Sequence, residues 1–228
     1  MNEKTSYLRR FVTVSLLVFT LSVSFVGIAQ DVTDVRLPDL RDELLARADE
    51  DQAARKTAIA WVALHGADGI VDENALDEEE KAAYASLWAK VATVDADNTA
   101  WLKGVVENHG WVTYSDVGRD GAGAAWLIVQ HADADPSFQR LCLDLMKALP
   151  EDEVSQQDLA LLTDRVLLAE GKPQIYGSQF VVRDGKWVPL NLEDEENVDA
   201  RRAEVGLPPM HEYRKLLEAL QRGEVEID

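Results

Sequence analysis

Cysteine is almost missing from this sequence: Cys142 is the only one among 228 residues. A single cysteine excludes an internal disulfide, so a folded form of this chain depends on its hydrophobic core. Cys142 falls on the apolar face of a helix expected from about residue 136 to residue 149. That position favours a buried and inert thiol, and it gives no support to a cysteine nucleophile.

Basic residues are also scarce. The chain has 23 Lys and Arg residues against 42 Asp and Glu residues, which gives a formal net charge of −19. A surface of this charge repels nucleic acid and anionic lipid, so we expect no nucleic-acid partner and no membrane contact beyond an N-terminal leader. The acids are spread over helix faces and short runs, which is typical of a solvated surface.

The sequence lacks the spacing of established catalytic and ligand motifs. It has no serine elbow, no zinc-binding histidine pair and no phosphate loop. The run Asp95–Asn98 resembles the opening of a calcium loop, but Ala100 stands where that loop needs glycine and Val106 where it needs a bidentate glutamate. We therefore expect no metal and no cofactor, and no motif of this kind indicates a reaction.

Residues 1–29 have the pattern of an export signal. Lys4, Arg9 and Arg10 precede a stretch from residue 11 to 28 without charge, and Ala29 follows. The pattern predicts a signal peptide cleaved after Ala29 and a periplasmic or secreted protein, while the length of the stretch leaves an uncleaved membrane anchor as the alternative. Residues 30–228 have the length of one domain with a sizeable core.

Hydrophobic periodicity predicts that helices dominate this domain. We expect helices over about residues 37–64, 81–94, 98–109, 124–130, 136–149, 156–170, 197–205 and 209–221, and a loop over 111–123. The segments 179–183 and 186–190 flank Asp184-Gly185, which is a strong hairpin signal. A lone hairpin is marginal in water. The sequence therefore predicts a mainly α fold, a single-domain helical bundle with one small β-hairpin packed on it.

Two charges interrupt a helix that is otherwise apolar. The segment Leu159–Ala169 has apolar side chains on every side, yet it carries Asp164 and Arg165. A helix that is apolar all round is buried, so these charged side chains must either form ion pairs or take part in a functional site. They indicate a group of polar side chains inside the helical core.

The first long helix also carries charge in its apolar stripe. Asp51 and Arg55 lie one turn apart, within the stripe that Leu44 and Val62 define. A buried ion pair would satisfy both side chains. Fixing the packing is the favoured role of this pair, and a role in a site is the alternative.

His131 and Asp133 lie in a tight corner between two expected helices. One hypothesis is an exported hydrolase-like enzyme in which His131 is the general base, Asp133 or Asp164 orients it, and Arg165 stabilises developing negative charge. Histidine suits proton transfer near neutral pH. A lone histidine in such a corner is nevertheless more often a hydrogen-bonded structural residue.

A second hypothesis is a binding module for a small polar or cell-envelope ligand. Amide, phenol and guanidinium groups orient a ligand without supplying a strong nucleophile. The residues of this kind beside the apolar runs are Gln130, Gln174, Tyr176, Gln179, Arg201 and Arg202. A third hypothesis is a purely structural hydrogen-bond network that fixes the hairpin on the helices. The sequence leaves all three open, together with the oligomeric state.

Several segments resemble an uncharacterised bacterial domain family. They are Gln130–Asp133, Phe138-Gln139, Asp164-Arg165, Gly171–Gln179, Val198–Arg202 and Gly206–Tyr213, with Gly110-Trp111 and Asp51–Arg55 before them. Ser178 and Val112 depart from the expected pattern, where threonine and proline are usual. The resemblance covers most of residues 30–228. It implies membership of that family, and it implies no activity because the family has no assigned reaction, cofactor or ligand.

Overall fold

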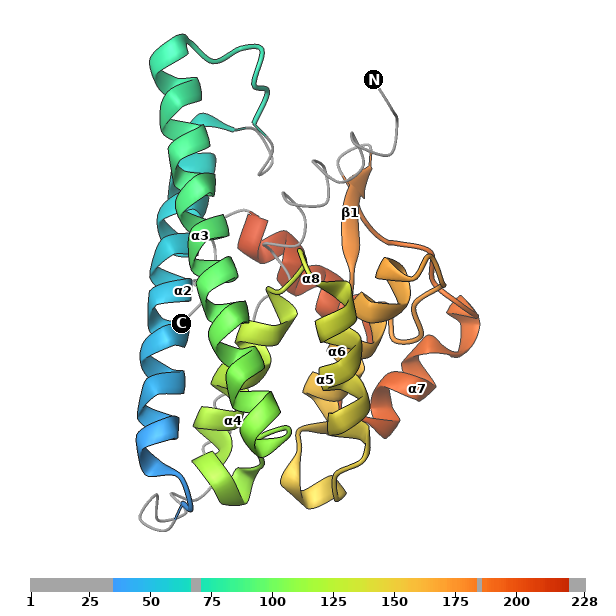
Figure 1. Ribbon diagram of the computed structural model, residues 1–228. Coiled ribbons are helices and arrows are strands. Elements are labelled where there is room, and N and C mark those ends of the chain that lie inside the picture. The colour runs from blue at the N-terminus through green and yellow to red at the C-terminus, as the bar shows by residue number, and fades with distance from the viewer. Residues whose placement is uncertain (1–34, 67–70, 184–185, 222–228) are drawn as a thin grey trace.

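The computed structural model describes residues 35–66, 71–183 and 186–221 (Figure 1). Within these ranges the fold is mainly α, which confirms the expected class. The elements are α2 (Pro38–His65), α3 (Glu78–His109), α4 (Tyr114–Gln130), α5 (Pro136–Lys147), α6 (Gln156–Ala169), β1 (Phe180–Arg183), β2 (Lys186–Pro189), α7 (Val198–Glu204) and α8 (Met210–Gln221), with 3₁₀ turns at Glu151–Glu153 and Glu195–Asn197. None of the described helices has the length and apolar character needed to cross a membrane. The expected leader lies outside the described residues.

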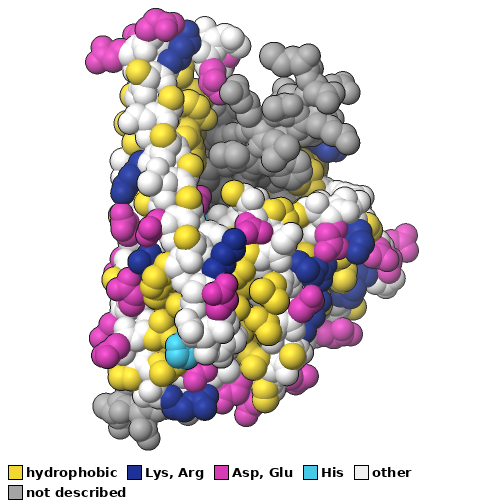
Figure 2. Space-filling view, viewed as in Figure 1, with side chains coloured by type: hydrophobic (Ala, Val, Ile, Leu, Met, Phe, Trp, Pro, Cys, Tyr) yellow, Lys and Arg dark blue, Asp and Glu magenta, His cyan; other side chains and the backbone are white. Residues whose placement is uncertain are grey.

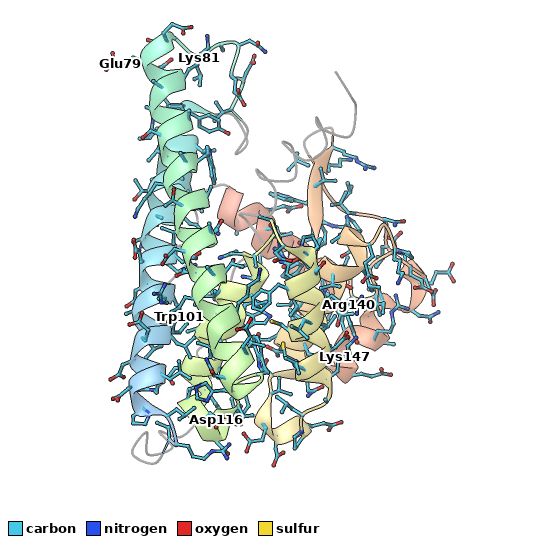
Figure 3. All side chains as sticks on the ribbon, viewed as in Figure 1. Glu79, Lys81, Trp101, Asp116, Arg140 and Lys147 are labelled. Atoms are coloured by element: carbon cyan, nitrogen blue, oxygen red, sulfur yellow. The ribbon has the colours of Figure 1, made fainter. Side chains whose placement is uncertain are left out.

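Helices α2 and α3 run side by side, and the end formed by the C-terminus of α2 and the N-terminus of α3 projects beyond the rest of the molecule (Figure 1). Glu79 and Lys81 mark this projecting end (Figure 3). The start of α3 is fixed by a capping box, in which Asp77 accepts from the Glu80 backbone and Glu80 accepts from the Asp77 backbone. Nearer the body of the molecule, the Arg47 guanidinium of α2 lies 4.5 Å from the ring centroid of Trp101 on α3 (Figure 3).

The expected break between two helices near residues 95–98 is wrong, because α3 runs through it without interruption. Val91 and Leu102 are buried, and Asp95 and Asn98 lie between them on the same stripe at helical spacing. The polar side chains face α2, where Arg55 and Arg47 bind them. Tertiary partners therefore support a helix where local sequence suggested a loop.

The expected loop over residues 111–123 is also wrong in part, because α4 begins at Tyr114. Thr113 and Asp116 form a capping box that starts the helix. Gly118 then interrupts it with φ 75°, a left-handed conformation that only glycine adopts readily. The Gly- and Ser-rich composition thus marks a kink inside a helix and not an extended loop.

The main hydrophobic core surrounds α4, which packs against α2 and α3 on one side and α5 and α6 on the other. The apolar run Ala124–Val129 is buried at every position, as a helix that is apolar on every side requires, and Gln130 after it is buried too. Cys142 of α5 is fully buried in this core, and burial raises the pKa of its thiol to about 12. On the outer surface, acidic side chains are scattered over the visible face (Figure 2).

A smaller core lies under the hairpin. Phe180 and Trp187 of the hairpin pack with Val198 of α7 and with Met210, Tyr213 and Leu217 of α8. The strands pair antiparallel with Phe180 opposite Pro189 and Arg183 opposite Lys186, so the expected hairpin is confirmed. Its expected turn, residues 184–185, lies outside the described residues.

Candidate functional site

The corner after α4 brings His131 against α2. Nδ1 of His131 lies 3.0 Å from Oδ1 of Asp51 and 3.1 Å from Nε of Arg55. Nε of Arg55 in turn lies 3.2 Å from Oδ2 of Asp51. All three side chains are buried. The ion pair on α2 and the histidine of the corner, which the sequence placed in separate segments, therefore meet in one cluster.

The contacts of Nδ1 fit either neutral tautomer of His131, and the charges around the ring favour one of them. Nδ1 cannot at once donate to the Asp51 carboxylate and accept from the Arg55 Nε–H group. The arrangement that satisfies the charges places the proton on Nδ1, so that both His131 and Arg55 donate to Asp51. Asp51 is then the shared acceptor that holds the imidazole in place.

Asp95 of α3 completes the cluster by accepting a hydrogen bond from Nη2 of Arg55. We call Asp51, Arg55, Asp95 and His131 the polar centre. Asp95 was not among the site residues predicted from the sequence, although its spacing from Val91 and Leu102 places a charge inside the α3 stripe. With His131 neutral, two carboxylates share one guanidinium, so the centre holds one negative charge in excess unless a proton is bound.

Burial and neighbouring charges shift the pKa values of the polar centre. Burial, reinforced by the positive charge of Arg55, lowers the pKa of His131 to about 4, so its imidazole is neutral at pH 7. Burial raises the pKa of Asp95 to about 7, and the charge of Asp51 adds to this effect against the attraction of Arg55. Burial also opposes ionisation of Asp51, but His131 and Arg55 outweigh it and lower its pKa. Asp51 is thus the ionised carboxylate, and Asp95 is the one that binds the excess proton.

A second ion pair lies at the same corner. Nη1 of Arg165 is 2.8 Å and 3.0 Å from the two carboxylate oxygens of Asp133. Arg165 is buried, whereas the side chain of Asp133 is 53% exposed. Desolvation opposes ionisation of Asp133, but Arg165 outweighs it and lowers the pKa of this carboxyl. The charge of Arg165 also acts on His131 and lowers its pKa.

Gln139 of α5 fixes the end of α4. Its amide nitrogen donates to the carbonyl oxygens of Val129 and Gln130 and to Oδ1 of Asp133. Orphan carbonyls at a helix end need such partners. The side chain of Gln130 is buried, and its Nε2 has no hydrogen-bond partner within the part of the chain that the structure describes.

Asp164 serves a different network from its neighbour Arg165. Its carboxylate accepts from the backbone N–H groups of Ile175 at 2.7 Å, Tyr176 at 3.0 Å and Ser178 at 2.9 Å. Burial raises the pKa of Asp164 more than these three donors lower it. Asp164 therefore anchors the loop between α6 and β1, whereas the carboxylate beside the His131 ring is that of Asp51.

The residues considered for ligand binding surround this loop. Gln174 donates to Gln179 O and Leu190 O and accepts from Gln179 N. Arg201 and Arg202 donate to loop carbonyls, Arg201 to Ile175 O at 2.9 Å and Arg202 to Tyr176 O at 2.8 Å.

The other residues considered for ligand binding also contact groups of the protein itself. Gln179 donates to Ser178 Oγ at 3.1 Å, and the Arg202 guanidinium lies 4.9 Å from the Tyr213 ring centroid. The side chain of Tyr176 is half-buried. The loop amides thus face a carboxylate and its carbonyls face two guanidinium groups, an arrangement that fixes the loop.

Three side chains of the polar centre have the donor types of a metal site. One ligand atom each of Asp51, Asp95 and His131 lies within 4.8 Å of the others. Arg55, however, contacts all three and supplies the positive charge that a cation would bring. The centre as arranged suits a guanidinium, and a metal ion would have to displace it.

Comparison with known proteins gives one match. Residues 38–225 match the family described as "Family of unknown function (DUF6624)". This agrees with the resemblance to an uncharacterised domain family. Neither a curated protein nor a solved structure matches the chain.

Proposed function

We propose that this chain, which belongs to the family of unknown function DUF6624, is a hydrolase-like enzyme that uses His131 as its general base. The observation that carries the proposal is the 3.0 Å contact between Asp51 Oδ1 and His131 Nδ1. A carboxylate on Nδ1 fixes the imidazole, and Nε2 is then the ring atom that takes up a proton. Nε2 is buried, so the proposal requires the corner after α4 to open for water and substrate. Asp51 takes the orienting role that sequence analysis considered for Asp133 or Asp164.

The proton transfers follow from this arrangement. A water molecule gives a proton to Nε2 of His131 while its oxygen attacks the electrophilic atom of the substrate. The ionised carboxylate of Asp51 stabilises the imidazolium that forms. Arg165, paired with the half-exposed Asp133, supplies positive charge for the negative charge that develops on the substrate.

Asp95 is the group of the centre suited to give a proton near neutral pH. Its pKa is raised to about 7, and its side chain is 24% exposed. A base with a low pKa beside an acid with a raised pKa is the separation that acid–base catalysis requires. In the proposal Asp95 donates its proton to the leaving group. Afterwards His131 releases its proton to solvent and Asp95 takes one up from solvent, which restores both groups.

The test is hydrolysis of chromogenic carboxylic esters, phosphate esters, amides and glycosides by the full chain and by His131→Asn. We expect turnover of one class and a loss of about 100-fold or more in His131→Asn, the usual contribution of general base catalysis. His211→Asn is the matched control, because the His211 side chain is 64% exposed and outside the centre. It should keep full activity.

Asp51→Asn is a second variant that separates catalysis from folding. We expect it to lower kcat with little change in KM, while circular dichroism shows the helical content of the wild type. No turnover of any class by the wild type, or equal turnover by the folded His131→Asn and Asp51→Asn variants, overturns the proposal. The polar centre is then a structural network.

We also propose export, which rests on the pattern of residues 1–29 alone. The protein recovered from the periplasm or medium of a bacterial host should begin at Gln30, as intact mass would show. Recovery of the chain with Met1 in the membrane fraction would support the uncleaved anchor and contradict cleavage.

A further inference from the structure

A cavity of about 520 Å³ lies between β2 and α8. This volume is within the range of small-molecule sites, which is about 300 to 1,000 Å³. Trp187, Pro189 and Leu192 give it an apolar wall. None of its lining residues belongs to the polar centre, so an inference about the cavity is independent of the proposed hydrolase activity.

Charges of both signs line the same cavity. Arg214 and Glu218 lie one turn apart on α8, and Lys186 and Glu195 come from the hairpin and the 3₁₀ turn that follows it. Nε of Arg214 is buried and has no hydrogen-bond partner among the described residues. Nε itself is closed to solvent, so a ligand carboxylate would meet the accessible part of the half-buried Arg214 guanidinium at the wall of the cavity.

We propose that this cavity binds a small zwitterion with an apolar side chain, of the class of free apolar amino acids and short apolar peptides. The ligand carboxylate pairs with Arg214 and Lys186, and its ammonium group pairs with Glu218. The apolar side chain packs against Trp187 and Leu192.

The balance of charge favours a zwitterion over a simple anion or cation. The lining contributes two basic and two acidic side chains. The basic pair would attract an anion, but the acidic pair would repel it. A cation would be attracted by the acidic pair and repelled by the basic pair. A ligand that carries both an ammonium group and a carboxylate offers a group of opposite charge to the basic pair and to the acidic pair.

The test is isothermal titration calorimetry of the full chain with L-phenylalanine and L-leucine. N-acetyl-L-phenylalanine lacks the ammonium group, and phenethylamine lacks the carboxylate. We expect saturable binding of at least one amino acid and binding of both analogues weaker by about tenfold or more.

Variants assign the binding to the cavity. Arg214→Gln and Glu218→Gln should each weaken amino-acid binding by about tenfold, the order expected for one charge-assisted pair. Lys215→Gln is the matched control, because Lys215 is the next residue on α8, is exposed and does not line the cavity. Circular dichroism and melting temperature would show that the variants are folded.

Three results would overturn the proposal. The first is the absence of saturable heat up to about 10 mM of either amino acid, a concentration corresponding to roughly 3 kcal/mol of binding free energy. The second is unchanged amino-acid binding by the folded Arg214→Gln variant. The third is binding of the acetylated analogue as tight as that of L-phenylalanine. None of these results bears on the activity proposed for His131, so the two proposals fail separately.

Discussion

Oδ1 of Asp51 lies 3.0 Å from Nδ1 of His131, although 80 residues separate them along the chain. The contact joins α2 to the end of α4 inside the protein, where both side chains are almost without solvent exposure. The contact orients the imidazole and makes its position dependent on the packing of two helices, while burial and the charge of Arg55 keep it neutral against the pull of Asp51. Stability and chemistry at this point are therefore coupled.

The first prediction concerns acid. Burial lowers the pKa of His131 to about 4, against 6.5 for the free side chain. The unfolded chain therefore binds a proton more readily than the folded one as the pH falls from 6.5 towards 4, and the folded state loses about 2 to 3 kcal/mol over this window. Urea unfolding between pH 7.5 and 4.5 should show this loss in the wild type beyond that of His131→Asn.

Asp95 has the opposite effect on the same pH axis. Its folded pKa is raised to about 7, so its contribution to stability is present in acid and is lost as the pH rises through 7. Both proteins contain Asp95, so the difference between wild type and His131→Asn reports His131 together with its coupling to Asp51. Parallel stability curves for the two proteins would contradict the lowered pKa of His131.

The second prediction concerns metal binding. In Arg55→Gln the guanidinium that contacts Asp51, Asp95 and His131 is absent, while three donor atoms within 4.8 Å of one another remain. Zn²⁺ or Mn²⁺ should then raise the melting temperature of the variant by about 4 °C or more, as a ligand selective for the folded state does. The wild type should show no such shift.

Lys56→Gln is the matched control for this change, because Lys56 is the adjacent residue on α2 and is exposed. It should behave like the wild type with and without metal. Stabilisation of all three proteins to the same extent would mean that the guanidinium does not exclude a cation.

The third prediction concerns the loop before β1. Asp164→Asn leaves one carbonyl oxygen where two carboxylate oxygens now accept from Ile175, Tyr176 and Ser178. At least one buried N–H group loses its acceptor, which costs about 1 to 3 kcal/mol. Hydrogen exchange at these three amides should be faster in the variant. Asp144→Asn, at a 60% exposed side chain on α5, should change neither stability nor exchange.

The fourth prediction separates two glycines of α4. Gly118 has φ 75°, and an added Cβ would lie 2.9 Å from Oδ1 of Asp120, so Gly118→Ala should destabilise the protein by about 1 to 3 kcal/mol. Gly123 has no atom within 4 Å of an added Cβ. Gly123→Ala should therefore be neutral or stabilising by up to about 1 kcal/mol, as alanine is in a helix. Equal effects in thermal unfolding would contradict a strained kink.

Local patterns were sufficient for the fold class and for most helix ends. Pro38 and Gly66 bound α2, Asp135 caps α5 through the Phe138 amide, and Ser155 caps α6 through the Asp158 amide. These signals involve residues within a few positions of one another, so the sequence carries them directly. The hairpin strands were found for the same reason.

Local sequence patterns predicted the wrong secondary structure where the stabilising partner of a polar residue is distant in sequence. Asp95 and Asn98 read locally as a loop, but Arg55 and Arg47 of α2 hold them inside a continuous helix. The Gly- and Ser-rich start of α4 read as a loop because the capping box at Thr113 was not recognised. In both places the intrinsic helix propensity of the residues mattered less than packing and helix capping.

By itself the sequence determined that this protein is a mainly helical, strongly acidic chain without disulfides, and that Asp51, Arg55, Asp164 and Arg165 lie on buried stripes. Helical periodicity shows which face of a helix a residue occupies. It does not show which face of another helix lies opposite. Only the tertiary structure decided that Asp51 holds His131, that Arg165 pairs with Asp133, and that Asp164 anchors a loop. Those pairings span 11 to 80 residues of sequence, and they depend on how the helices pack.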